Sequence, residues 1–254
     1  MTTLAVPGAT ITYDVHGHGP VLLLIPGGPA DAAVFTHLRP LLAEDHTVVT
    51  YDPRGLSRSS LDGAPGPDPL RDHAEDVHRL LAEAGPADVL ASSGGAITLL
   101  ELLRHHPADV RTAVLHEPPV TRYLPAGALD GPDIPALFRD HGLAAAFAAF
   151  MKVVGVDPAP PLDPRAEGNF AYFFGHLMPA TGAYEPDLDA LRATPARLVV
   201  AVGEQSAGLP AHHAALGLAA ALGVATEVFP GGHGGFDTDA QAFAARLREV
   251  LKGC

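Results

Sequence analysis

The chain has 254 residues, a length typical of one or two domains. Its 16 Lys and Arg residues against 29 Asp and Glu residues leave a net charge of −13, which argues against a nucleic-acid partner and against a basic membrane-surface module. Hydrophobic residues make up 47% of the chain, so we expect a folded protein with a sizeable core. The one cysteine, Cys254, excludes an intramolecular disulfide and fits a reducing, cytoplasmic location.

Membrane insertion and secretion are not expected. The longest apolar runs, residues 143–151 and 21–25, are far shorter than the roughly 20 residues of a membrane helix. The first fourteen residues have no basic residue and no long apolar run, so they do not resemble a signal peptide.

In chain order, residues 2–15 predict a β-hairpin that turns at Pro7 and Gly8. Short, continuous apolar runs follow, which are typical of strands covered on both faces. These runs are Val21–Ile25, Thr47–Tyr51, Asp88–Ala91, Thr112–His116, Leu198–Val202 and Thr226–Phe229. Helical patterns lie between or after them at residues 72–84, 96–106, 211–222 and 239–251. The alternation predicts an α/β fold with a mostly parallel sheet and helices on both faces.

Residues 118–191 interrupt this alternation. They contain no convincing strand, two Pro-rich linkers and many aromatic side chains. We expect a helical lid inserted into a core formed by residues 1–117 and 192–254, and the alternative is a helical subdomain with its own small core. The lid's apolar side chains, together with Pro29, are the expected substrate contacts: Phe138, Phe147, Phe150 and Phe174.

A serine follows the predicted strand at residues 88–91 and precedes a helix, within Ala91-Ser92-Ser93-Gly94-Gly95. A nucleophile on such a sharp turn needs small neighbours two residues away on each side. Ser93 meets this condition with Ala91 and Gly95, whereas Ser92 would be preceded by the larger Leu90. Ser93 is therefore the preferred nucleophile, and a simple Ser-Gly helix cap is the alternative.

Two glycine-rich loops supply the other expected groups. The first follows the strand at residues 21–25, and we expect the N–H groups of Gly28 and Gly94 to stabilise an oxyanion. Pro29 has no N–H and cannot do so. The second loop carries His233 after the last predicted strand, where a general base would follow the nucleophile in the chain.

These segments, in this order, resemble the α/β-hydrolase family over nearly the whole chain. Residues 51–59 add a further landmark, since they are similar to the family's D-x-R-G-x-G-x-S turn with Ser57 in place of the second glycine. The resemblance implies a mostly parallel, eight-stranded sheet and a serine nucleophile. We see no metal-ligand spacing and no dinucleotide loop in the sequence, so no metal and no cofactor are expected.

The family usually places an acidic residue after its seventh strand, but this chain has Ser206 there. Glu117, which follows the sixth strand, is the preferred substitute, because some α/β-hydrolases resemble this chain in that respect. Glu204 is the second candidate, although it lies two residues before the usual position.

The leading hypothesis is therefore a serine hydrolase acting on an ester, lactone, thioester or similar small apolar substrate, as a monomer or homodimer. Ser206 motivates the alternative, which is a non-hydrolytic cyclase or isomerase, or a ligand-binding protein with a degenerate triad. An interaction protein with a vestigial site is a weaker third hypothesis.

Overall fold

The computed structural model describes residues 2–124, 127 and 131–253. Cys254 and five residues of the expected lid lie outside these ranges. The fold is organised around one nine-stranded sheet with strand order β1-β2-β4-β3-β6-β7-β8-β9 and a short ninth strand beside β2. The strands are β1 (Thr2–Val6), β2 (Ala9–Gly17), β3 (Val21–Ile25), β4 (Thr47–Tyr51), β5 (Ser60–Leu61), β6 (Ala87–Ser92), β7 (Val110–His116), β8 (Arg197–Gly203) and β9 (Thr226–Phe229).

The expected mostly parallel α/β sheet is confirmed. Strand β2 pairs antiparallel with β1, β4 and β5, and every pairing from β4 to β9 is parallel. All six continuous apolar runs form strands, and the hairpin strand β2 extends two residues beyond the expected Val15. The two-residue strand β5 was not expected, because so short a segment carries no periodic signal.

Strand residues alternate between two cores on opposite faces of the sheet. In β3, Leu23 and Ile25 belong to one buried cluster and Leu22 and Leu24 to the other. Because both faces are covered, the strands have continuous rather than alternating apolar sequences.

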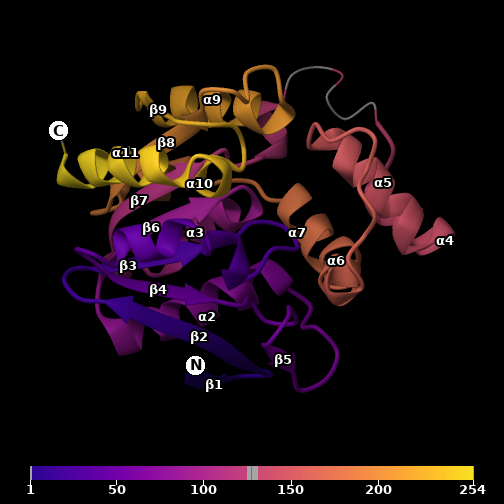
Figure 1. The fold of residues 1–254 in the computed structure, drawn as a ribbon, viewed down its shortest axis with the longest axis horizontal. Helices are drawn as coiled ribbons and strands as arrows, with labels where there is room; N and C mark the ends of the chain where they lie inside the picture. The colour runs from indigo at the N-terminus through magenta and orange to yellow at the C-terminus, as the bar shows by residue number, and fades with distance from the viewer. Residues whose placement is uncertain (1, 125–126, 128–130, 254) are drawn as a thin grey trace.

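Helices cover both faces (Figure 1). Helices α2 (Pro69–Ala84), α3 (Gly94–His105), α8 (Leu188–Ala193) and α9 (Pro210–Leu222) bury side chains in one cluster. Helices α1 (Leu38–Leu42), α10 (Gly235–Thr238) and α11 (Ala240–Lys252) bury theirs in the other. Helix α2 begins where Asp68 accepts a hydrogen bond from the N–H of Arg71 and Pro69 occupies the first turn.

Between β7 and β8 the regular elements of the described residues are all helical. They include α4 (Ile134–His141), α5 (Leu143–Val153), α6 (Glu167–Tyr172), a π-helix (Phe173–Leu177) and α7 (Met178–Gly182). We call residues 118–191 the insertion; α4–α7 lie to one side of the sheet in Figure 1. The expected boundary at residue 191 falls inside α8, whose Leu191 packs into the sheet core.

A separate aromatic cluster forms within the insertion, and we call it the insertion cluster. Its buried members are Leu56, Ile134, Ala146, Phe147, Tyr172, Phe173, Phe174 and Leu177. Except for Leu56, all of them come from the insertion, so these helices have a small core of their own above the sheet. Within the described ranges, every helix is too short or too polar to cross a lipid bilayer.

Candidate active site

Ser93 lies on a strained turn between β6 and α3. Its backbone has φ of 52° and ψ of −125°, a conformation that non-glycine residues rarely adopt. Its N–H donates to the carbonyl of His116 at 2.8 Å, which fastens the turn to the end of β7. Ser93 is partly exposed, whereas the side chain of Ser92 is buried at the end of β6. Of the two serines, Ser93 is therefore the one that a substrate can reach.

The two expected oxyanion donors face each other across this turn. A Cβ atom added to Gly94 would lie 3.2 Å from the backbone N of Gly28, so the two backbones approach closely. Gly28 adopts a φ of +57°, and a Cβ added to Gly27 would lie 2.8 Å from the Cβ of Ser93. Gly27 and Gly94 thus let the loop after β3 approach the serine turn in a way that larger residues would obstruct, and Gly28 permits the positive φ of the loop.

His233 and Glu117 form a direct contact. The Nδ1 atom of His233 lies 2.5 Å from Oε2 of Glu117, and the Glu117 side chain has no exposed surface. His233 itself is about one quarter exposed, with 27% of its side-chain surface accessible. Glu204, the second candidate acid, has an exposed side chain. The structure therefore brings Glu117, and not Glu204, against the predicted base.

The other oxygen of Glu117 is held by the loop after β8. Oε1 accepts hydrogen bonds from the N–H of Gly203 at 2.8 Å and from the Ser206 hydroxyl. Burial raises the pKa of the Glu117 carboxyl, but the hydrogen bonds, above all that with His233, outweigh it and hold the pKa at about 2. The Glu117 carboxylate is therefore ionised at neutral pH although it is buried.

Ser206 occupies the position where the family usually has its acid, and it has a different part in this structure. Its hydroxyl contacts Glu117 and lies 3.3 Å from Nδ1 of His212, at the start of α9. The same His212 nitrogen lies 3.7 Å from Oε1 of Glu117. No local sequence pattern predicts the contact between Ser206 and Glu117, because it joins residues 89 positions apart.

The loops after β8 and β9 are joined by their backbones. The N–H of Gln205 donates to the carbonyl of Gly231 at 2.9 Å, and that of Glu204 donates to Phe229 at 2.9 Å. A Cβ added to Gly203 would lie 2.7 Å from the carbonyl oxygen of Gly232. This packing sets the position of the His233 loop relative to the loop that holds Glu117.

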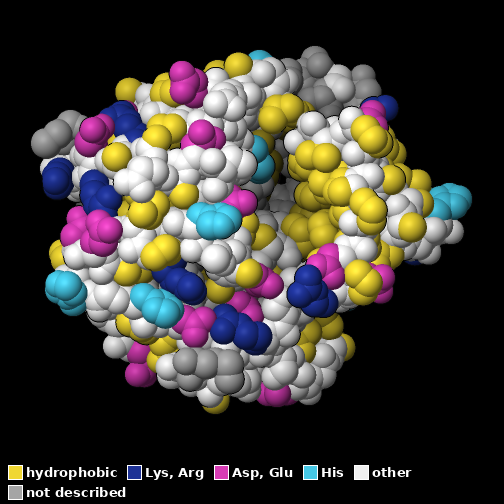
Figure 2. Space-filling model, viewed as in Figure 1, with side chains coloured by type: hydrophobic (Ala, Val, Ile, Leu, Met, Phe, Trp, Pro, Cys, Tyr) yellow, Lys and Arg dark blue, Asp and Glu magenta, His cyan; other side chains and the backbone are white. Residues whose placement is uncertain are grey.

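The predicted aromatic contacts of the insertion lie mainly against one another. The Phe138 and Phe150 rings each lie within 6.0 Å of the Phe174 ring between centroids, and Phe147 and Phe174 are buried in the insertion cluster. Figure 2 shows a hollow between the insertion and the sheet domain, with hydrophobic side chains along the insertion side. Substrate contact by these residues stays a prediction.

Two residues of the insertion that were not among the predicted site residues touch the loop after β3, which carries Gly28 and Pro29. The Phe173 ring lies over Gly28, 3.5 Å from where a Cβ would be. Asn169 donates to the carbonyl of Pro29 at 3.1 Å and to the Ser57 hydroxyl at 2.9 Å, and it accepts from the Ser57 N–H at 2.8 Å. Asn169 therefore links α6 to the loops after β3 and β4. The signal in the sequence that could have indicated this role is a single asparagine, Asn169, on an aromatic-rich helix.

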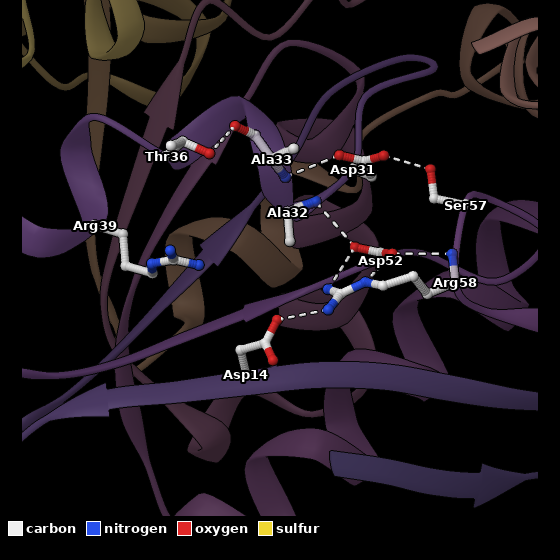
Figure 3. Close-up of a pocket in the computed structure, with 9 residues that line it drawn as sticks. All are labelled: Asp14, Asp31, Ala32, Ala33, Thr36, Arg39, Asp52, Ser57 and Arg58. Atoms are coloured by element: carbon white, nitrogen blue, oxygen red, sulfur yellow. Dashed lines mark hydrogen bonds and ion pairs between the residues drawn. The ribbon is translucent and has the colours of Figure 1, made fainter. Parts of the chain in front are cut away.

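A second hollow, of about 290 Å³, lies beside the second half of β2 and the loops after β3 and β4 (Figure 3). Most of its charged groups pair with each other: Arg58 bonds to Asp52 at 2.7 Å and to Asp14 at 2.8 Å. Neither Ser93 nor His233 lines it. The hollow is thus distinct from the candidate active site.

Known proteins resemble this chain in sequence and in fold. A family model described as the alpha/beta hydrolase fold matches residues 20–154. An uncharacterized hydrolase from Bacillus subtilis (strain 168), YraK, is 34% identical over 98% of this chain and 95% of its own length.

Solved structures of other proteins have a similar fold. An alpha/beta hydrolase from Sphaerobacter thermophilus superimposes with a TM-score of 0.78 at 22% identity, covering 98% of this chain and 100% of that one. The enol-lactonase from Burkholderia xenovorans LB400 has a TM-score of 0.73 at 19% identity, covering 99% and 100%. The family model and the B. subtilis relative both extend over at least half of the chain, and the chain therefore belongs to the α/β-hydrolase fold family.

Proposed function

We propose that this α/β hydrolase is a cofactor-independent serine hydrolase that cleaves small apolar esters, lactones or thioesters through Ser93, His233 and Glu117. The observation that carries the proposal is the buried, ionised Glu117 carboxylate 2.5 Å from Nδ1 of His233. A carboxylate in this place fixes the imidazole tautomer and stabilises the imidazolium that forms during acyl transfer. With Nδ1 bound to Glu117, Nε2 is the nitrogen left for the nucleophile.

In the proposed reaction, the Ser93 oxygen attacks the acyl carbon while His233 Nε2 accepts its proton. The N–H groups of Gly28 and Gly94 stabilise the oxyanion of the tetrahedral intermediate. When the intermediate collapses, His233 gives the proton to the leaving oxygen or sulfur. A water molecule then attacks the acyl-enzyme with His233 as base, which releases the acid and restores the Ser93 hydroxyl.

An apolar acyl group fits the surroundings of this site. Phe173 covers Gly28, and the hollow between the insertion and the sheet domain is flanked by hydrophobic side chains (Figure 2). We propose that Pro29 and the predicted residues Phe138, Phe147, Phe150 and Phe174 shape this apolar region. A lactone is a suitable substrate to test beside open-chain esters of increasing acyl length.

The proposal is tested by labelling with a fluorophosphonate probe and locating the adduct by mass spectrometry. We expect one adduct at Ser93 that is absent in Ser93→Ala and strongly reduced in His233→Ala. Ser92→Ala is the matched control, because its side chain is buried beside the turn, and it should retain labelling. A folded protein that reacts at no serine, or reacts equally well in Ser93→Ala, would contradict the proposal.

The alternative of a cyclase, isomerase or ligand-binding protein was motivated by Ser206 in the usual acid position. Because the Ser206 hydroxyl contacts Glu117, its presence there no longer favours that alternative. Turnover of p-nitrophenyl esters or a lactone, measured beside the labelling, distinguishes hydrolysis from a reactive serine without hydrolytic turnover.

A further inference from the structure

A group of titratable side chains lies at the far end of α3 from Ser93. His78 comes from α2, His106 is the residue that ends α3, and Asp109 lies in the short 3-10 helix Pro107–Asp109 that follows. One ligand atom from each of these three side chains lies within 4.8 Å of the other two. We propose that His78, His106 and Asp109 bind a divalent transition-metal ion.

The three side chains lie close enough together to share an ion. Nδ1 of His78 lies 2.6 Å from Oδ2 of Asp109, in a hydrogen bond that an ion would replace. The two imidazole rings are stacked, with centroids 3.7 Å apart and an interplanar angle of 9°, so one ring must rotate before both rings can direct a nitrogen at the same ion. All three residues are partly buried, so an ion would be held in a shallow site that water can still reach to complete its coordination. Two imidazoles and one carboxylate suit zinc, cobalt or nickel better than magnesium or calcium.

A fourth residue fixes the orientation of one ligand. Nε2 of His106 lies 3.0 Å from Oε1 of Glu75, which leaves Nδ1 of His106 as the ring nitrogen available to an ion. Glu75 is in turn held by Arg71 at 2.8 Å, one turn earlier on α2. Metal-binding histidines commonly donate their second ring nitrogen to a carboxylate in this way, which sets the tautomer and strengthens the ligand.

The electrostatic surroundings also favour a cation. His106 stands at the carboxyl end of the twelve-residue helix α3, where unpaired carbonyl groups make the helix terminus partly negative. Asp109 adds a carboxylate, and the whole chain has a net charge of −13. The helix terminus, the Asp109 carboxylate and the net negative charge would all attract an ion bound between α2 and the end of α3.

Such an ion would join α2, the end of α3 and the 3-10 helix that follows it, which already contact one another. It would lie roughly 18 Å from Ser93, because α3 has twelve residues at a rise of about 1.5 Å each. We therefore assign the ion a structural role. Binding of the ion should raise the thermal stability of the protein and leave the chemistry at Ser93 unaffected. No local sequence pattern indicates this site, since His78 lies on a different helix from the other two ligands.

The test uses chelator-treated full-length protein without a histidine tag. Equilibrium dialysis against Zn²⁺, followed by elemental analysis, should find one tightly bound ion per chain, and Co²⁺ should give the visible absorption of a bound site. Zn²⁺ should also raise the melting temperature. His78→Ala and Asp109→Asn should each abolish tight binding, and Glu75→Gln should weaken it about tenfold.

His105→Ala is the matched control, because His105 is adjacent to His106 but pairs with Glu101 at 2.9 Å. It should bind Zn²⁺ like the unaltered chain. The proposal is overturned if the unaltered chain binds Zn²⁺ no more tightly than His78→Ala does, or if His105→Ala loses binding to the same extent as His78→Ala. Because Glu75→Gln removes no ligand, unchanged affinity in that variant would overturn the assigned part of Glu75.

Discussion

The two carboxylate oxygens of Glu117 have different partners, and these contacts predict how single substitutions should affect the site. One oxygen contacts His233, and the other is occupied by Gly203 and Ser206. The residue also has a positive φ of 50°, which is unusual for glutamate. Its backbone is held there because its N–H donates to Ala201 at 2.9 Å. The strained backbone thus directs the side chain into the site.

Glu117→Gln should lower kcat for an ester substrate on the order of 10⁴-fold, because the amide cannot stabilise the imidazolium of His233. Glu204→Gln is the control, since Glu204 has an exposed side chain, and its kcat should be nearly unchanged. Steady-state kinetics on the two purified variants decide the assignment. A large loss in Glu204→Gln with little loss in Glu117→Gln would make Glu204 the acid.

The contact between Ser206 and Glu117 predicts that a carboxylate at position 206 can replace the one at 117. In the double variant Glu117→Gln/Ser206→Asp, the new carboxylate is on residue 206, whose side chain already contacts residue 117. It would therefore need to reach only a short way further to contact His233. We expect this variant to recover at least tenfold in kcat over Glu117→Gln alone. Ser206→Asp with Glu117 retained should be impaired instead, because two buried carboxylates would lie side by side. Equal activity of the double and single variants would contradict the prediction.

At the scale of elements, the insertion is fastened to the sheet domain at Asn169. This side chain is mostly buried and makes three hydrogen bonds to the loops after β3 and β4. Its carbonyl partner, Pro29, is adjacent to the proposed oxyanion donor Gly28. The position of α6 and the shape of the loop after β3 are therefore coupled through one residue.

Asn169→Ala should raise KM and lower kcat/KM by roughly tenfold, since it removes the three hydrogen bonds to Ser57 and Pro29, each worth about 0.5–1.5 kcal/mol, that hold the loops after β3 and β4 against α6. Hydrogen exchange should become faster in α6 and in the loop at residues 26–30. Glu167→Gln, on an exposed position of the same helix, serves as the control and should match the unaltered chain. If the two variants behave alike, Asn169 does not couple the insertion to the loop.

The strands and the site could be predicted from the sequence to different extents. Continuous apolar runs identify buried strands, because a strand covered on both faces has no polar positions to interrupt it. Ser93, Glu117 and His233 could be predicted as site residues because each follows such a run or lies in the loop after it. The contacts of Ser206 and Asn169 could not, because each joins segments 89 or more positions apart, and nothing local indicates which segments meet.

At the scale of the whole molecule, parallel strand order explains why the predicted residues lie near one another. β6, β7, β8 and β9 are consecutive neighbours that run in the same direction, so their carboxyl ends share one edge of the sheet. Ser93, Glu117, Ser206 and His233 follow these four strands in order. Ligand sites of open parallel sheets commonly form at this edge.

The same arrangement leaves His116 buried beneath the site. It has no exposed surface, is surrounded by the rings of Phe229, Phe236 and Phe243, and within the described part of the chain neither ring nitrogen has a hydrogen-bond partner. Burial therefore lowers the pKa of His116 from 6.5 to about 4. The native state thus holds this imidazole neutral where the unfolded chain would protonate it.

Acid should accordingly destabilise the protein in two steps. Between pH 6.5 and 4 the unfolded state binds a proton at His116 that the folded state does not, so the free energy of unfolding falls by about 3 kcal/mol as the pH is lowered. Glu117 has a folded pKa lowered from 4.5 to about 2, so its contribution is present above pH 4.5 and is lost as the pH falls through 2. Urea unfolding at pH 7, 5.5 and 4 measures the first step. Burial lowers the pKa of His73 as well, to about 3, so His73 adds to the fall over this range. His116→Leu should therefore remove only its own share of the fall, about 3 kcal/mol, whereas His16→Gln, at an exposed position, should leave the fall unchanged. An equally steep fall in His116→Leu would contradict the part assigned to His116.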